Sequence, residues 1–229
     1  MSGKKAKALL FDFGGTLDAE GIPWKDRWHR IACQEGVDAP REDFDRAFYG
    51  ATDVLEGTIP KSAGFRDLVD RVAEGLAVRL GQDFKEGALL RKVGNRFTED
   101  SLRQLSQSAD LLARLRPSYR IGIVSNFYGN LHAVCDEAGL TPSIGVAVDS
   151  TLVGCKKPDP RIFQAALDAL ETAPEDTVFV GDSMRRDMAG ARAMGMRHVW
   201  LRAASETSGS CCSGDAVIAR LSELSDLDL

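Results

Sequence analysis

Ala8-Leu-Leu-Phe-Asp12-Phe-Gly-Gly-Thr16 is a short apolar run that ends in a carboxylate and two glycines. A run of this length bounded by turn residues is typical of a strand buried on both faces. Gly14 and Gly15 predict a turn directly after it. We therefore expect a buried strand that delivers Asp12 into a glycine turn.

Similar apolar runs recur later in the chain, and most of them end at a polar residue. They cover residues 121–126, 144–149, 177–182 and 198–202. Helical apolar spacing separates them, as in residues 111–115 and 162–170. Strands that alternate with helices predict the α/β class, with a Rossmann-like parallel sheet. Ligands of such sheets bind beyond the carboxyl ends of the strands, where Asp12, Ser125, Asn126 and Asp182 fall.

The strand pattern disappears between about residue 18 and residue 108, where amphipathic helical patterns replace it. The expected helices cover residues 24–35, 41–49, 65–80 and 84–105. An all-helical insertion after the first strand predicts an inserted helical cap domain over residues 18–108. The core domain is then formed by residues 1–17 and 109–229, with hinges near residues 18–23 and 106–109. A last helix is expected over residues 216–224.

The composition fits a folded protein with mixed surface charge. Hydrophobic residues make up 44% of the 229 residues, and 29 Lys and Arg stand against 34 Asp and Glu. This balance argues against disorder and against nucleic acid as a partner. No run approaches the roughly 20 apolar residues of a membrane span, so no membrane partner is expected. The five cysteines form no C-x-x-C pair, which favours reduced thiols in the cytoplasm, with Cys211 and Cys212 exposed in a loop over 205–214.

Four motifs resemble, in order, those of the haloacid dehalogenase-like (HAD) hydrolase superfamily. They are Phe11-Asp-Phe-Gly-Gly-Thr-Leu17, Ser125-Asn126, Lys157-Pro-Asp-Pro160 and Gly181-Asp-Ser-Met-Arg-Arg-Asp187. The segment that follows, residues 187–200, resembles the helical-cap phosphatase branch in particular. The resemblance implies hydrolysis of a small phosphorylated metabolite through an aspartyl-phosphate.

The resemblance also implies roles for individual residues. Asp12 matches the nucleophile, which splits one displacement into two easier steps. Lys157 would neutralise the oxygens of the transferring group, while Ser125 donates its hydroxyl and Asn126 its backbone N–H. Gly15 permits backbone N–H groups to approach a phosphate closely.

A metal ion is expected because a nucleophilic carboxylate and a phosphate dianion repel each other. The resemblance supplies Mg²⁺ ligands from Asp12, the backbone carbonyl of Gly14 and Asp182. Asp187 would lie outside them and orient a metal-bound water or Lys157, and it is also placed to cap a helix. The adjacent Lys156 is interpreted as a solvated surface charge.

Gly14 departs from the family pattern, since phosphatases of this family usually carry an Asp there as general acid and base. Loss of such assistance slows a reaction by about 10²- to 10⁴-fold. Asp18, Glu20 or a residue of the cap could compensate. For Asp18 and Glu20 taken singly, we favour the interpretation as ordinary loop residues.

Other functions stay open because of Gly14. One is a catalytically impaired protein that keeps a phosphate or partner site. A phosphonatase-like hydrolase would need a Schiff-base lysine from the cap, where the candidates are Lys25, Lys61, Lys85 and Lys92. A dehalogenase is disfavoured because the acidic metal motif is kept.

Aromatic and imidazole side chains are interpreted as structural. Trp24 and Trp28 are expected to pack on one cap face, with the alternative that either lines the substrate entrance. The three histidines have no partners at metal-ligand spacing; they are His29, His132 and His198.

Overall fold

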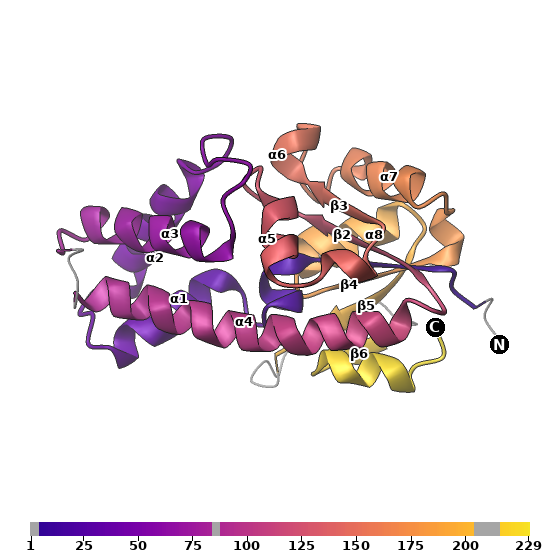
Figure 1. The fold of residues 1–229 in the computed structure, drawn as a ribbon, viewed down its shortest axis with the longest axis horizontal. Helices are drawn as coiled ribbons and strands as arrows, with labels where there is room; N and C mark the ends of the chain where they lie inside the picture. The colour runs from indigo at the N-terminus through magenta and orange to yellow at the C-terminus, as the bar shows by residue number, and fades with distance from the viewer. Residues whose placement is uncertain (1–4, 84–87, 204–215) are drawn as a thin grey trace.

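The computed structural model describes residues 5–83, 88–203 and 216–229 of the chain. The molecule is elongated, with a helical bundle at one end and a sheet covered by helices at the other (Figure 1). The bundle consists of α1 (Trp24–Gln34), α2 (Arg41–Asp53), α3 (Phe65–Arg79) and the first part of α4 (Leu89–Leu115). In the described residues, none of the helices has the length and apolar character needed to cross a membrane.

Within the described residues, the sheet has six parallel strands in the order β3-β2-β1-β4-β5-β6. The strands are β1 (Ala8–Phe11), β2 (Arg120–Ser125), β3 (Val146–Asp149), β4 (Thr177–Gly181), β5 (Arg197–Leu201) and β6 (Ala216–Ile218). The apolar run before Asp12 is thus a central strand, paired with β2 on one side and β4 on the other. The predicted Rossmann-like parallel α/β fold is confirmed.

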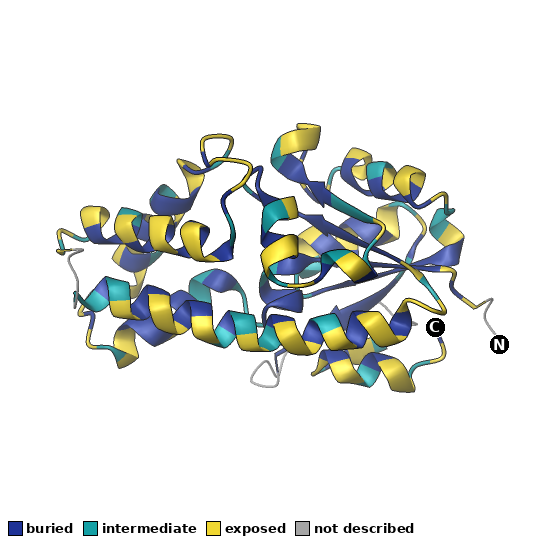
Figure 2. Ribbon diagram, in the orientation of Figure 1, coloured by how far each residue is buried: buried dark blue, intermediate teal, exposed yellow. Residues whose placement is uncertain are grey.

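Helices cover both faces of the sheet, and the side chains of β1 alternate between them. Leu9 and Phe11 belong to a core shared with α4, α5 (Leu131–Glu137) and a final 3₁₀ segment. Ala8 and Leu10 belong to a second core, formed with α7 (Pro160–Ala169) and α8 (Ala189–Ala193). Figure 2 shows the strands buried and the helices exposed only on their outer sides. This explains why the strand sequences are almost wholly apolar.

Shorter elements connect these layers. They are η1 (Phe13–Leu17), η2 (Thr141–Ser143), α6 (Ser150–Val153), η3 (Pro174–Asp176), η4 (Met184–Met188) and η5 (Leu221–Asp226). The turn η1 follows β1 and η4 follows β4 on the same edge of the sheet, because parallel strands end together.

One expectation about the elements is wrong. The helix predicted over residues 216–224 is instead strand β6, where Val217 and Ile218 pair with the edge of β5, followed by η5. The hinge expected near residues 106–109 lies within α4, which is continuous from Leu89 to Leu115, and the domain boundary at residue 108 stays a prediction. Ser108 in this segment is buried, and its hydroxyl donates to the carbonyl of Leu17 at 2.7 Å.

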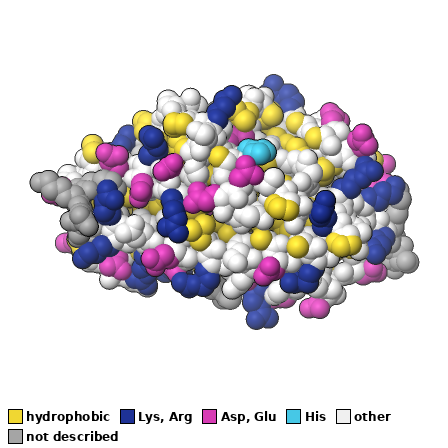
Figure 3. Space-filling view, in the orientation of Figure 1, with side chains coloured by type: hydrophobic (Ala, Val, Ile, Leu, Met, Phe, Trp, Pro, Cys, Tyr) yellow, Lys and Arg dark blue, Asp and Glu magenta, His cyan; other side chains and the backbone are white. Residues whose placement is uncertain are grey.

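The surface carries charges of both signs without a large field of one sign on the face drawn in Figure 3. Of the described cysteines, Cys33 is exposed, whereas Cys135 and Cys155 are buried as free thiols. Cys211 and Cys212, and the loop expected over 205–214, lie outside the described residues.

Candidate active site

Charged side chains from four segments converge beyond the carboxyl ends of β1, β2 and β4. Asp12 follows β1 directly, and its amide continues the sheet by donating to Val180 O at 2.9 Å. Asp182 follows β4, Asp187 lies in η4, and Lys157 comes from the loop before α7. The expected grouping at this edge therefore exists in the fold.

Lys157 connects the carboxylates of this group. Its Nζ lies 2.7 Å from Asp12 Oδ1 and 2.7 Å from Asp187 Oδ1. Burial disfavours its charged form, but the two carboxylates outweigh burial, so the pKa of Lys157 is raised above its ordinary value. The ammonium is therefore charged and shared between the two aspartates.

Ser125 and Asn126 hold this arrangement from the end of β2. The Ser125 hydroxyl donates to Asp12 Oδ1 at 2.9 Å. The Asn126 side chain brackets the backbone of Lys157, accepting from its N–H at 2.7 Å and donating to its carbonyl at 3.2 Å. Both contacts to Asp12 meet Oδ1, and no described residue donates a hydrogen bond to its Oδ2.

The carboxylates outnumber the nearby cation. Oxygen atoms of Asp12, Asp182 and Asp187 lie within 4.8 Å of one another. Burial, followed by repulsion from the other two carboxylates, raises the pKa of Asp182 well above its ordinary value. Burial is also the largest cause of the raised pKa of Asp187. Within the described chain, the only hydrogen bond to the Asp182 carboxylate is a long one of 3.5 Å from Thr16.

These residues fit a divalent cation. Hard cations such as Mg²⁺ prefer carboxylate oxygens, and the three carboxylates exceed the charge that Lys157 alone can balance. A cation there would remove the repulsion that raises the pKa of Asp182.

The two glycines of the turn are restricted to different degrees. Gly15 has φ 91°, and a Cβ there would lie 2.6 Å from Asp182 Oδ2, so only glycine fits. Gly14 has φ −77° and ψ 116°, which any residue adopts. A Cβ on Gly14 would instead lie 3.2 Å from Nε1 of Trp24. The space above Gly14 is therefore limited by an indole and not by the backbone.

Asp18, considered above as a replacement acid or a loop residue, is neither exposed nor free. Its side chain is 0% exposed and accepts from the Gly15 N–H, Trp24 Nε1 and Arg27 Nη1, each at 2.7 Å. Burial raises its pKa, and the Arg27 guanidinium opposes that shift. The interpretation of Asp18 as an ordinary loop residue is wrong, because its carboxylate is a buried anchor. Glu20 lines a different cavity, beside Arg220.

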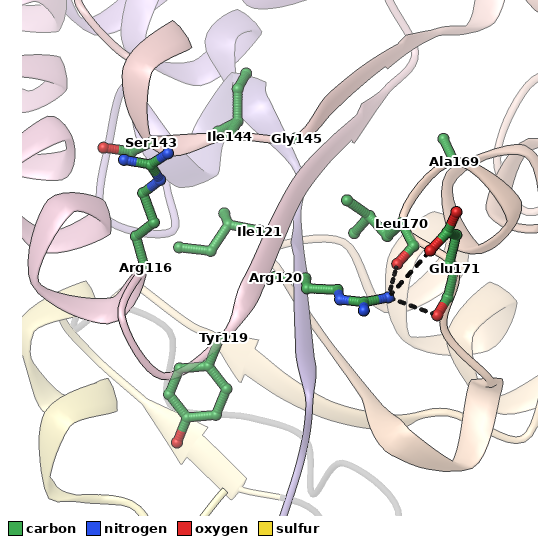
Figure 4. Close-up of a pocket in the computed structure, with 10 residues that line it drawn as sticks. All are labelled: Arg116, Tyr119, Arg120, Ile121, Ser143, Ile144, Gly145, Ala169, Leu170 and Glu171. Atoms are coloured by element: carbon green, nitrogen blue, oxygen red, sulfur yellow. Dashed lines mark hydrogen bonds and ion pairs between the residues drawn. The ribbon is translucent and has the colours of Figure 1, made fainter.

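A cavity of about 480 Å³ opens above Asp12 between the sheet edge and the helical bundle. Asp12, Gly14, Ser125, Asn126 and Lys157 line it from the sheet side. The facing wall comes from the bundle and from neighbouring loops, with Trp24, Lys25, Asp26, Phe48, Tyr49, Thr52, Asp53 and Glu56. Another cavity lies at the opposite, amino edge of β2 and β3, around Arg116, Arg120 and Leu170, and contains none of the charged group (Figure 4).

Several wall residues were not found from the sequence. Tyr128 and Arg186 line the cavity. Tyr128 lies two residues after Asn126, and Arg186 lies within the motif that ends at Asp187, so these positions could have indicated them. The residues of α2 carry no such indication, because their approach depends on how the bundle packs. Lys156, interpreted as a solvated charge, lines the cavity and pairs with Glu56 at 2.6 Å.

Only some of the tryptophans and lysines of the bundle line the cavity, among the residues that the structure describes. Trp24 lines the cavity, whereas Trp28 is buried and stacks on Phe97 with ring centroids 4.8 Å apart. Of the described lysines named as Schiff-base candidates, only Lys25 lines the cavity, and its Nζ pairs with Asp45 at 2.9 Å. Lys85 lies outside the described residues.

The three histidines lie outside the acidic group of Asp12, Asp182 and Asp187. His29 packs on the ring of Phe44 with ring centroids 5.1 Å apart, and exposed His132 lies 3.2 Å from Asp136. His198 is buried in β5. None of the three is part of the acidic group around Asp12.

Comparison with known proteins identifies the family. A family model described as haloacid dehalogenase-like hydrolase matches residues 6–195. Glyceraldehyde 3-phosphate phosphatase of Pyrococcus furiosus is 43% identical over 204 residues, which cover 87% of this chain and 82% of that protein. A crystal structure of a HAD phosphatase from Thermococcus onnurineus covers 96% of both chains with a TM-score of 0.56 and 22% identity, a likeness of fold alone.

Other matches are partial. Haloacid dehalogenase-like hydrolase domain-containing protein 3 of Bos taurus is 35% identical over 112 residues, which cover 48% of this chain and 44% of that relative. The chain thus spans less than half the length of this curated relative. The family model, by contrast, spans most of the chain, and this chain belongs to the haloacid dehalogenase-like hydrolase family.

Proposed function

We propose that the protein is a Mg²⁺-dependent phosphohydrolase that cleaves a small phosphorylated metabolite through a phosphoryl group carried on Asp12. The observation that carries this proposal is the contact of Lys157 with both Asp12 and Asp187, beside Asp182, at the floor of the cavity. The phosphatase activity named for the Pyrococcus furiosus relative supports the same reaction class.

Asp12 is the nucleophile of this proposal. Ser125 and Lys157 both contact Oδ1, so the carboxylate is fixed while Oδ2 stays without a hydrogen-bond donor among the described residues. As Asp12 bonds to phosphorus, the bond from phosphorus to the leaving oxygen breaks and the dephosphorylated product departs, which leaves an aspartyl-phosphate. Water then cleaves the aspartyl-phosphate, releasing phosphate and restoring the carboxylate. Lys157 neutralises the transferring oxygens, and Asn126 positions Lys157 by holding its backbone.

Asp12, Asp182 and the backbone carbonyl of Gly14 would hold Mg²⁺, with Asp187 next to them. The ion supplies positive charge that offsets the repulsion between the carboxylates and a phosphate dianion. Asp187 also keeps Lys157 in place through its 2.7 Å contact. The residues of this group thus divide into two that bind the ion by side chains and one that supports the lysine.

We further propose that the helices of residues 24–105 act as a cap, because they supply one wall of the cavity. Substrate selection then depends on α1 and α2. A cytoplasmic location stays a prediction from the cysteine pattern.

A second candidate is a binding protein that keeps the phosphate site but turns over slowly. Gly14 favours this candidate because no carboxyl group occupies that position. A phosphonatase-like reaction has less support, since the cavity-lining Lys25 is paired with Asp45 and an ion-paired ammonium is a poor amine nucleophile.

Hydrolysis of p-nitrophenyl phosphate tests the proposal, because its leaving group needs little acid assistance. We expect turnover with Mg²⁺ that is lost in excess chelator, and a panel of phosphorylated metabolites then identifies the substrate. Turnover that is unchanged by chelator would refute the metal assignment. Phosphate binding by calorimetry without any turnover would favour the binding protein.

A further inference from the structure

Trp24 closely limits the side-chain space of residue 14. A Cβ built on Gly14 would lie 3.2 Å from Nε1 of Trp24 and 3.5 Å from its Cδ1 and Cε2. The Gly14 backbone has ordinary dihedral angles, so the indole alone restricts this position. Gly14 and Trp24 therefore form a pair in which the missing side chain is matched by a large one from α1.

Hydrogen bonding and ring packing hold the indole in this place. Nε1 of Trp24 donates to Asp18 Oδ2 at 2.7 Å. Its ring packs edge-on against Phe97 and Phe127, with ring centroids 5.4 Å and 6.2 Å apart. Rotation of Trp24 would break the bond to a fully buried carboxylate, which is costly. The indole is thus a fixed part of the cavity wall.

Trp24 cannot take over proton delivery from the missing side chain. An indole has one N–H donor and no acceptor, and here Asp18 takes that donor. Two carboxylates of the cavity wall are also engaged, because Glu56 pairs with Lys156 and Asp26 pairs with Arg41. The leaving oxygen therefore meets an aromatic wall at the place where a side chain of residue 14 would stand.

We propose that Trp24, fixed by Asp18, determines the leaving-group specificity of the site and restricts it to phosphates whose leaving oxygen departs without a proton, acyl phosphates above all. This inference rests on the proposed phosphohydrolase function. It assigns Trp24 as a specificity-determining residue and Asp18 as the residue that positions it.

The chemistry balances without an acid for an acyl phosphate. An oxygen of Asp12 forms a bond to phosphorus, the bond from phosphorus to the acyl oxygen breaks, and the electron pair leaves with a carboxylate anion. Water then bonds to phosphorus, the aspartyl bond breaks, and the proton lost by water passes to phosphate or solvent. An alkyl phosphate would release an alkoxide in the first step and therefore needs a proton donor.

Wild-type protein provides the first test. We would measure kcat/KM for acetyl phosphate, p-nitrophenyl phosphate and an alkyl phosphate such as glycerol 3-phosphate, each corrected with Asp12→Asn protein. Because general acid assistance is worth about 10²- to 10⁴-fold, the acyl and aryl substrates should exceed the alkyl one by at least about 10²-fold. Equal values within about tenfold, with turnover dependent on Asp12, would overturn the inference and leave the proposed function intact. Absence of Asp12-dependent turnover of every substrate would refute both.

A mutant cycle provides the second test. Gly14→Asp alone should raise alkyl-phosphate turnover little, because Trp24 occupies the space. Gly14→Asp with Trp24→Leu should raise it by about 10²-fold relative to Trp24→Leu alone. Gly14→Asp with Trp28→Leu is the matched control, since Trp28 lies on the same helix but not in the cavity, and it should show no such gain.

The same variants separate the effect of Trp24 from that of the rest of the cavity wall. A full gain in Gly14→Asp alone, or an equal gain with Trp28→Leu, would show that Trp24 is not the restriction. Alkyl turnover in wild-type protein that is lost in Asp53→Asn would overturn the inference by identifying another acid in the wall. If the double variants unfold, the wild-type substrate series still decides the question.

Discussion

Two polar clusters include carboxylates six residues apart in the chain, Asp12 and Asp18, and differ in charge balance. The site cluster, Asp12, Lys157, Asp182 and Asp187, has three carboxylates for one ammonium. The anchor cluster, Asp18, Trp24, Arg27 and Ser101, has one carboxylate for one guanidinium. Burial raises the pKa of Asp182 and of Asp187 in the site cluster, and no described cation forms an ion pair with Asp182.

Each side chain of the anchor cluster makes at least one hydrogen bond to another member. Arg27 donates through Nη1 to the Asp18 carboxylate at 2.7 Å and to the Asp18 carbonyl at 3.1 Å, and through Nη2 to the Ser101 hydroxyl at 2.7 Å. Together these bonds tie the turn after β1 to α1 and α4. A balanced, saturated cluster serves the fold, whereas an unbalanced one is suited to bind a charged ligand. Acidic residues of similar burial thus have opposite roles.

We expect the largest difference in turnover between the variants Asp12→Asn and Asp18→Asn. Asp12→Asn removes the nucleophile, so we expect p-nitrophenyl phosphate turnover to fall by at least about 10⁴-fold without loss of folding. Asp18→Asn keeps the nucleophile and should retain measurable kcat in the folded fraction. An equal loss of turnover in both variants, with circular dichroism showing both folded, would contradict the assignment of different roles to the two clusters.

Asp18→Asn should reduce the free energy of unfolding more than a matched substitution of an exposed aspartate. An amide cannot accept from the Gly15, Trp24 and Arg27 donors together, and breaking a buried ion pair from one side reduces the free energy of unfolding by about 3–5 kcal/mol. Urea denaturation measures this. The control is Asp43→Asn, which breaks an exposed pair with Arg46 and should change stability by less than about 1 kcal/mol. Similar losses in the two variants would mean that the anchor cluster does not stabilise the fold.

Added Mg²⁺ should stabilise the site cluster and leave the anchor cluster unaffected. A ligand that binds only the folded state at 100 times its Kd adds about 2.7 kcal/mol. Thermal unfolding should therefore shift upward with Mg²⁺ in wild type and in Asp18→Asn, but not in Asp182→Asn. The same shift in Asp182→Asn would place the ion elsewhere.

Asp149 extends the comparison to a buried carboxylate that has no cation partner among the described residues, and here we expect the smallest change in stability. Backbone N–H groups of Gly129, Leu131 and Thr151 satisfy it. Burial raises its pKa above the ordinary value. Its contribution to stability is therefore full below the unfolded pKa and decreases as pH rises through the folded pKa.

Wild type should accordingly lose stability relative to Asp149→Asn as the pH rises from about 4, the ordinary pKa of an aspartate. Denaturation of both proteins across this range measures the difference, because all other titrating groups are shared. A difference that stays constant or moves in the opposite sense would show that the three N–H groups outweigh burial.

The sequence predicted the elements that place the site. Short apolar runs that end at Asp12, Ser125 and Asp182 are local patterns, and a parallel sheet brings such ends together whatever the rest of the chain does. The parallel sheet and the convergence at one edge could therefore be predicted. Lys157 was reached only through the resemblance of Lys157-Pro-Asp-Pro160 to a motif of the family.

The features that sequence reasoning missed depend on tertiary contacts. Ser108, in the segment expected to hold a hinge, is buried inside α4, and residues 216–218 form a strand because the edge of β5 is available. In the sequence Asp18 resembles a loop residue, because its partners Trp24 and Arg27 contact it only when α1 packs beside the turn. Local pattern gives no information about such partners.

Trapping phosphorylated Asp12 tests the central claim most directly. Protein mixed with p-nitrophenyl phosphate and Mg²⁺ would be quenched in acid within milliseconds, digested and mapped by mass spectrometry, with Asp12→Asn as control. The account predicts a phosphorylated Asp12 peptide, formed in a burst because Gly14 supplies no base for the second step. Rapid product release with no phosphate on Asp12 at any quench time, or with phosphate on a different residue, would contradict it.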